Sequence, residues 1–328
     1  MSQIAKAASQ SRRPKILRAG IAKMSDLQDF PSPVPDLFVD AKTGANSNDG
    51  YSWDSALYTM AAALSKAQTG NRIFFRGKIA EEIVGSNLKF DISIIGVGSK
   101  HHADEPSSAY HPGAAVWQPP ASPTAATPLL KVRGRGWNFV NILFDCPVDS
   151  AALYLERNAS SGTDEYDASH ASIIGCDFRN GKYAIQDVGG VWNIRIEDCD
   201  FETIDEASGC AIINTSTAVA VPRRWLILNN RFQTDSSTEG NLQHIDSPLN
   251  GSVIRGNTFG TVKSTGIYID LTGGTGNIVY ENLLMGAYDT SDYVAGTGDS
   301  WAGNQSLSAS FGGNSAQGTT LATPAAAT

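Results

Sequence analysis

The sequence predicts an all-β fold, a right-handed parallel β-helix (a solenoid) that begins with a capping α-helix. Three observations predict it: a short apolar motif that repeats along the chain, the lack of a helical pattern between its copies, and one amphipathic segment ahead of the first copy. The composition agrees, because 32 glycines and only 18% charged residues in 328 suit many short strands joined by turns.

The repeat has a β-branched residue first, Cys or Asn fourth, and Phe or Leu sixth. Its copies start at Ile173, Ile196, Ile227, Ile254 and Val279, which are 23, 31, 27 and 25 residues apart. Each of the first four is followed by a second short apolar segment, such as "YAIQD" or "CAIIN". An earlier copy, "FVNILFD", begins at Phe139.

A unit of this size has too small a core to fold alone, so consecutive units must stack and bury their apolar positions against each other. The uneven spacing favours a parallel β-helix whose loops differ in length from coil to coil. We then expect the fourth positions to form a vertical ladder in which amides hydrogen-bond from coil to coil. This ladder comprises Cys176, Cys199, Asn230, Asn257 and Asn282, with Phe178, Phe201, Phe232 and Phe259 stacked beside it.

The segment "SALYTMAAALSKA" supplies the cap that a β-helix needs to close its first coil against water. Its apolar residues recur at helical spacing, at Ala56, Leu57, Met60, Ala61 and Leu64. The strand-like segments "RIFF" and "EEIV" follow.

The stretch "FVDAKTGANSNDGYSWDSALYTMAAAL", with the later "ISIIGVG" and "LLKVRGRGWNFVNILFD", resembles the pectin-lyase-like superfamily, and in particular its bacteriophage tailspike-type members. The resemblance covers about residues 36 to 286. It implies a β-helix whose long face binds polysaccharide, which some members cleave with paired carboxylates or with Ca²⁺ and a basic residue. Its motifs are specific for the fold and weak for activity.

Charge and composition divide the chain into three parts. Residues 1–35 form a basic arm with a Pro-rich spacer, because the first 24 residues carry six cations and no acid. Residues 36–286 form the capped β-helix, and residues 287–328 form a tail rich in Gly, Ala, Ser and Thr that we expect to make oligomer contacts. We expect Arg12, Arg13, Lys15, Arg18 and Lys23 to attach the protein to an acidic surface of a virus particle.

The best candidate catalytic pair is Asp246 and Asp270, since each follows an Ile of a second strand, in a column that also holds Gln186 and Asn214. Two carboxylates on consecutive coils would lie close enough for acid and base work on a glycosidic bond. The alternative is that both acids form turns at strand ends. His244 is interpreted as an ordinary surface residue.

Trp137, Trp192 and Trp225 are candidate ligand-binding residues, because aromatic rings at the mouth of a groove stack on sugars. The alternative is that each ring only covers the sheet under a loop. The four cysteines are expected to be reduced, because they form no CxxC pair.

We expect no metal site and no cofactor. His101, His102 and His111 share a segment with two acids, but their spacing fits no metal site that we recognise, and there is no nucleotide fingerprint. The repeats show no cluster of three or four acids with a nearby Arg or Lys, which disfavours a Ca²⁺-dependent lyase. No apolar run is long enough to cross a membrane, and we expect neither membrane insertion nor nucleic acid binding.

These features favour a structural protein of a bacteriophage virion: a homotrimeric spike or fibre, or a capsid-surface decoration protein. It would be assembled in the host cytoplasm, bound to capsid or tail proteins through its arm, and would contact host surface polysaccharide. The alternative is a tailspike depolymerase, an endo-glycosidase acting on bacterial surface polysaccharide. A third class, a bacterial adhesin, is disfavoured by the lack of an export signal in the first thirty residues.

Overall fold

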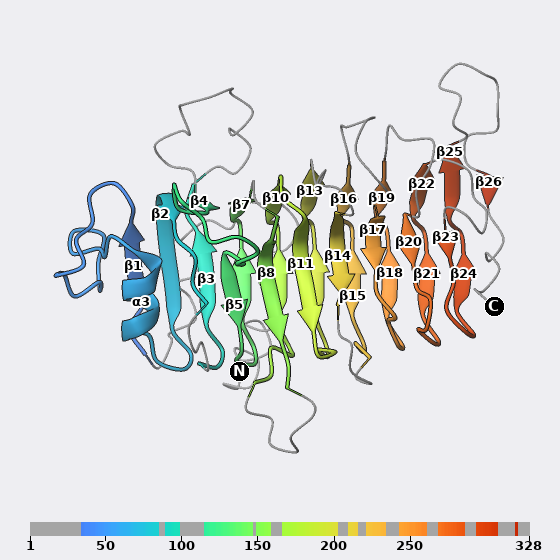
Figure 1. Ribbon diagram of the computed structural model, residues 1–328, viewed down its shortest axis with the longest axis horizontal. Coiled ribbons are helices and arrows are strands. Elements are labelled where there is room, and N and C mark those ends of the chain that lie inside the picture. The colour runs from blue at the N-terminus through green and yellow to red at the C-terminus, as the bar shows by residue number, and fades with distance from the viewer. Residues whose placement is uncertain are drawn as a thin grey trace, which may run out of the picture.

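The computed structural model describes residues 34–84, 89–98, 115–146, 149–158, 166–202, 209–215, 221–233, 243–260, 268–285, 293–307 and 319–320. These residues form a right-handed parallel β-helix whose coils are stacked along one long axis from β1 to β25 (Figure 1). The predicted fold class is therefore confirmed.

Each complete coil contributes one short strand to each of three parallel sheets. Sheet A contains β1 (Leu37–Asp40), the first half of β2 (Arg72–Ala80), β3 (Ser93–Gly96), β6 (Asn138–Val140), β9 (Ser172–Ile174), β12 (Arg195–Glu197), β15 (Leu226–Leu228), β18 (Val253–Arg255), β21 (Ile278–Tyr280) and β24 (Ser300–Ala302).

Sheet B contains the second half of β2 and then β4 (Ala115–Gln118), β7 (Leu143–Asp145), β10 (Asp177–Arg179), β13 (Asp200–Glu202), β16 (Arg231–Phe232), β19 (Thr258–Phe259), β22 (Leu283–Met285) and β25 (Gln305–Leu307), with β26 (Thr319–Thr320) added antiparallel. Sheet C contains β5 (Leu130–Val132), β8 (Ala151–Glu156), β11 (Tyr183–Val188), β14 (Cys210–Asn214), β17 (Gln243–Asp246), β20 (Ile269–Asp270) and β23 (Tyr293–Val294).

The turn from sheet A to sheet B is short because one residue adopts the left-handed conformation on coil after coil. The residue is the third of the repeat motif and is often Gly or Asn, which tolerate that conformation. Its φ lies between 53° and 67° at Asn141, Gly175, Asp198, Asn229, Gly256, Glu281 and Gly303. The repeat motif is thus one strand of sheet A, this turn, and one strand of sheet B.

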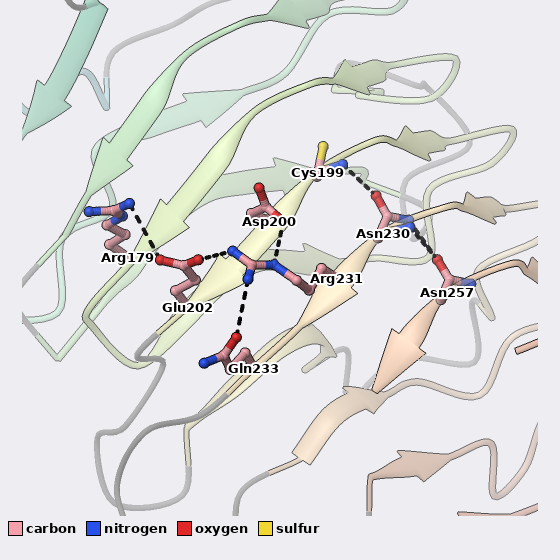
Figure 2. A network of polar contacts seen from close by, with 8 residues as sticks. All are labelled: Arg179, Cys199, Asp200, Glu202, Asn230, Arg231, Gln233 and Asn257. Atoms are coloured by element: carbon pink, nitrogen blue, oxygen red, sulfur yellow. Dashed lines mark hydrogen bonds and ion pairs between the residues drawn. The ribbon is translucent and has the colours of Figure 1, made fainter. Parts of the chain in front are cut away.

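The fourth motif positions form the ladder that the sequence predicts (Figure 2). The Asn257 side chain accepts hydrogen bonds from the backbone and side-chain nitrogens of Asn230, at 2.8 and 3.0 Å, and donates to Asn282 Oδ1 at 3.0 Å. Asn257 Nδ2 also donates to the Ile227 carbonyl at 2.9 Å. All four cysteines are free thiols, as expected.

The sixth motif positions fill the core beside this ladder. The rings of Phe144, Phe178, Phe201, Phe232 and Phe259 are stacked face to face on consecutive coils, with centroids 4.6 to 5.0 Å apart. All five are buried, as the predicted register requires.

Helix α3 (Met60–Lys66) covers the end of the first coil next to β1 (Figure 1). Its first backbone N–H groups donate to the Glu81 carboxylate, and Lys89 Nζ donates to the Ala67 carbonyl beyond its last residue at 2.6 Å. The predicted cap is present but shorter than expected. Leu57 pairs with β1 instead of joining the helix, and Ala61 is exposed.

The β-helix continues past residue 286, so the predicted start of the tail at residue 287 is too early. Strands β23, β24 and β25 extend all three sheets, and Trp301 is buried in the core of its own chain. Asn304 also continues the ladder by accepting a hydrogen bond from Asn282 at 3.0 Å.

Replacement of Asn257 by Ala should destabilise the protein by about 2 to 4 kcal/mol, because buried N–H and carbonyl groups of the neighbouring coils would lose their partners. The matched control is Asn229→Gly, at the exposed left-handed position of the corresponding turn one coil earlier, a conformation that Gly adopts easily. Thermal denaturation followed by circular dichroism measures both. Equal melting temperatures for Asn257→Ala and wild type would contradict a stabilising ladder.

Candidate functional site

The outward side chains of sheet C form one column along the β-helix, here called the sheet C column. In register on consecutive coils it comprises Lys131, Tyr154, Gln186, Ile213, Asp246, Asp270 and Val294. The first six of these side chains are half-buried, and the strands of sheet C run in the same direction in the front of Figure 1.

Asp246 and Asp270 are direct neighbours in this column, as predicted. Burial and the negative charge of Asp270 raise the pKa of Asp246. Asp270 Oδ1 accepts a hydrogen bond from the Thr272 backbone at 2.8 Å, so this carboxylate does form a turn at its strand end. Asp246 therefore keeps its proton to a higher pH than an ordinary aspartate, because burial and the nearby charge destabilise its ionised form.

Gln186 occupies the same column, but Asn214 does not, which corrects the predicted arrangement. Asn214 is paired with Asp187, one residue further along the strand. There, Asn214 Nδ2 donates to the fully buried Asp187 carboxylate at 2.6 Å, and burial raises the pKa of Asp187 to about 7. A buried Cys210 thiol lies near the acid pair instead. Burial and the charges of Asp246 and Asp270 raise its pKa.

His244 is buried, so its interpretation as a surface histidine is wrong. The imidazole is 5% exposed, lies near the rings of Phe232, Phe259 and Tyr268, and has Nε2 3.2 Å from the Gly260 carbonyl. Burial lowers the pKa of His244 to about 4. It is therefore a neutral core residue, one strand position before Ile245 and not in the column.

Two of the three candidate tryptophans lie in the core. Trp137 and Trp225 are both 0% exposed, and their indole N–H groups donate to the backbone carbonyls of Lys89 and Val191, at 2.7 and 2.9 Å. A fully buried ring presents no face to a sugar. Trp192 is different, because it is 36% exposed at the corner between β11 of sheet C and β12 of sheet A.

Cations lie over the aromatic rings at this corner and on the neighbouring strands of sheet C. Arg157 and Arg223 have their guanidinium carbons 4.1 and 5.6 Å from the centroid of the Trp192 ring. Lys131 lies over Tyr154 and Arg133 lies over Tyr166, at 4.5 and 4.4 Å. We call these seven residues the aromatic–arginine patch. The sequence indicated Trp192 but not the other members, because the seven residues come from five separate segments.

A second charged group, which the sequence analysis missed, lies on the outer face of sheet B (Figure 2). Arg231 donates to the carboxylates of Asp200 and Glu202, and Glu202 also pairs with Arg179 at 3.4 Å. Asp145 and Asp177 lie on the adjoining strands. Asp200 and Glu202 lie on β13, whereas Arg179 and Arg231 lie on the coils before and after it, so only the strand register brings these acids near the arginines.

This group does not form a metal site. No cluster of three or more His, Cys, Asp or Glu within the described ranges is arranged to hold a metal ion. The arginines instead neutralise the acids on sheet B.

Several predicted residues lie outside the described residues. These are the five cations of the arm, Arg12, Arg13, Lys15, Arg18 and Lys23, and the three histidines His101, His102 and His111. In the described part of the chain, no helix is long and apolar enough to span a membrane.

Comparison with known proteins found no matching family model and no matching curated protein. Among solved structures, pectate lyase Pel9A is similar with 15% identity and a TM-score of 0.44, over 86% of this chain and 78% of that one. A rhamnogalacturonan lyase has 8% identity and a TM-score of 0.41, over 83% and 87% of the two chains. Pectin methylesterase from Aspergillus niger has 15% identity and a TM-score of 0.41, over 81% and 91%. Similarity this low transfers neither substrate nor residue roles.

The buried His244 should make stability depend on pH. Its pKa is 6.5 in the unfolded chain and about 4 in the fold, so between these values only the unfolded state takes up the proton. Stability should therefore fall as the pH is lowered from 6.5 to about 4, and His244→Leu should remove this contribution. The exposed His170, replaced by Asn, is the control. Melting temperatures at pH 7 and pH 5 test this, and an unchanged difference in His244→Leu would contradict it.

Proposed function

We propose that the protein binds carbohydrate along the outer face of sheet C. The observation that carries this proposal is the sheet C column, which places an aromatic ring, an amide and two carboxylates in register on successive coils. Sugar rings offer hydroxyl groups to such polar side chains and C–H faces to aromatic rings.

The dimensions of the column suit a chain-like ligand. Neighbouring strands of a sheet lie about 4.8 Å apart, so the rungs from Lys131 to Asp270 extend over roughly 24 Å. A small metabolite would contact only one or two rungs, whereas a polysaccharide can contact all of them.

Hydrolysis of the bound glycan is a second candidate function, favoured by the raised pKa of Asp246 beside Asp270. Asp246 would protonate the glycosidic oxygen as the C–O bond breaks, and the Asp270 carboxylate would attack the anomeric carbon. Water would then hydrolyse the glycosyl ester, with Asp246 acting as base. The backbone separation of about 4.8 Å suits the retaining mechanism, in which the carboxyl groups lie about 5 to 5.5 Å apart.

One set of variants tests both functions on purified bacterial capsular and O-polysaccharides. We expect the wild type to bind at least one of them, and the isosteric Asp246→Asn to abolish any release of reducing ends while keeping most of the binding. Asp54→Asn, at an exposed residue near the cap, is the control. Binding without reducing ends from the wild type would exclude hydrolysis, and failure to bind any polysaccharide would contradict the proposed function.

We further propose that the chain belongs to a bacteriophage virion, as a homotrimeric spike, fibre or decoration protein attached through the arm of residues 1–35. The proposal is supported by the sequence resemblance to tailspike-type proteins and by the six cations of the arm. Deletion of residues 1 to 30 should give a folded trimer that no longer joins particles. Normal incorporation of the shortened protein would contradict attachment through the arm.

A further inference from the structure

We propose that the aromatic–arginine patch binds an anionic group of the glycan, a carboxylate, sulfate or phosphate. This proposal rests on the proposed carbohydrate function and names the class of polysaccharide, one that carries acidic substituents. The patch lies at the corner between sheets C and A, beside the N-terminal half of the sheet C column.

Trp192 is the centre of the patch. Its backbone pairs in parallel with that of Arg223 on the next coil, which fixes these two side chains on neighbouring rungs. Arg157 approaches the same ring at 4.1 Å, and its Nη1 donates to the Gly190 carbonyl at 3.3 Å. Two guanidinium groups are thus fixed around one exposed indole, where they can donate hydrogen bonds to a planar or tetrahedral anion.

The patch is continuous with the sheet C column through Tyr154. This residue belongs to both, and its pKa is raised by burial and by the charge of Glu156, against the effect of Arg133. Arg133 and Glu156 form an ion pair at 2.5 Å next to it. A glycan that contacts the column at Tyr154 can therefore place a neighbouring sugar near Arg157 and Arg223.

The patch gathers four cations, Lys131, Arg133, Arg157 and Arg223, on a protein whose formal net charge is −8. Arg133 pairs with Glu156, and the charge of Arg157 also acts on the buried Asp187. A cationic surface on an acidic body attracts anionic groups only where the cations gather, so the position of the acidic sugar would be specified.

A comparable pair on sheet A shows what a purely structural contact looks like. Arg255 also lies over an aromatic ring, that of Tyr280 at 5.0 Å, but it is neutralised by Glu281 at 2.9 Å. Within the described residues no carboxylate forms an ion pair with Arg223, which is exposed. Arg255→Gln, which removes a cation that is already paired with a carboxylate, is therefore a matched control for Arg223→Gln.

The test uses the full chain on an array of purified bacterial polysaccharides, grouped into neutral ones and those with uronate, sulfate or phosphate groups. Dissociation constants are then measured for those that bind. We expect acidic polysaccharides to bind, Arg223→Gln and Arg157→Gln each to weaken this binding about tenfold or more, and Arg255→Gln to match the wild type. Affinity should fall with added salt in the wild type and less steeply in Arg223→Gln.

The outcomes separate this inference from the function on which it rests. Binding confined to uronates, or to sulfated or phosphorylated glycans, supports the patch and identifies the anion. Two results would contradict anion binding by the patch: neutral polysaccharides bind as tightly as acidic ones, or Arg223→Gln and Arg255→Gln change the affinity for acidic polysaccharides to the same extent. Either result leaves the carbohydrate function in place. Failure of every polysaccharide to bind contradicts both.

Discussion

The ladder of buried asparagines holds the coils of this protein in register, and the rest of the structure depends on it. Each amide from Asn230 to Asn282 donates a hydrogen bond to the amide of the next coil, and each from Asn230 to Asn304 also donates to a carbonyl of the coil before. A coil shifted by one residue would leave these buried groups without partners and would turn the phenylalanine stack toward solvent. The left-handed residue before each amide makes the turn tight enough for the ladder to form.

Register inside the β-helix determines what is displayed outside it. Because equivalent positions of successive coils stack, one residue per coil is enough to build a continuous column of side chains along the β-helix. The same stacking puts Asp246 next to Asp270, and burial together with the charge of Asp270 raises the pKa of Asp246. It also brings Trp192 of one coil beside Arg223 of the next. The same strand register thus determines both the packing of the core and the order of the side chains in the proposed glycan site.

Features that repeat could be predicted from the sequence, whereas most features that occur once could not. The cap and the Asp246–Asp270 pair are the exceptions. The ladder and the aromatic stack are repeated at fixed motif positions, so the sequence located both. The last copy was missed because Trp301 replaces the β-branched residue, although Asn304 keeps the fourth position. Trp137 was misplaced because the sequence does not show whether a residue at a coil corner points inward, and His244 because it is buried within β17 directly before the inward Ile245. The charged group on sheet B, formed across coils, needed the strand register.

The central claim is that the outer face of sheet C, and not another face of the β-helix, contacts glycan. Tyr154 and Tyr280 allow a direct test, because each is a half-buried tyrosine beneath a cation, the first on sheet C and the second on sheet A. The dissociation constant of Tyr154→Ala and Tyr280→Ala should be measured for a polysaccharide that binds the wild type. A loss of affinity of about fivefold or more in Tyr154→Ala alone is the result we predict. Equal affinities in the two variants, or a loss confined to Tyr280→Ala, would contradict the claim.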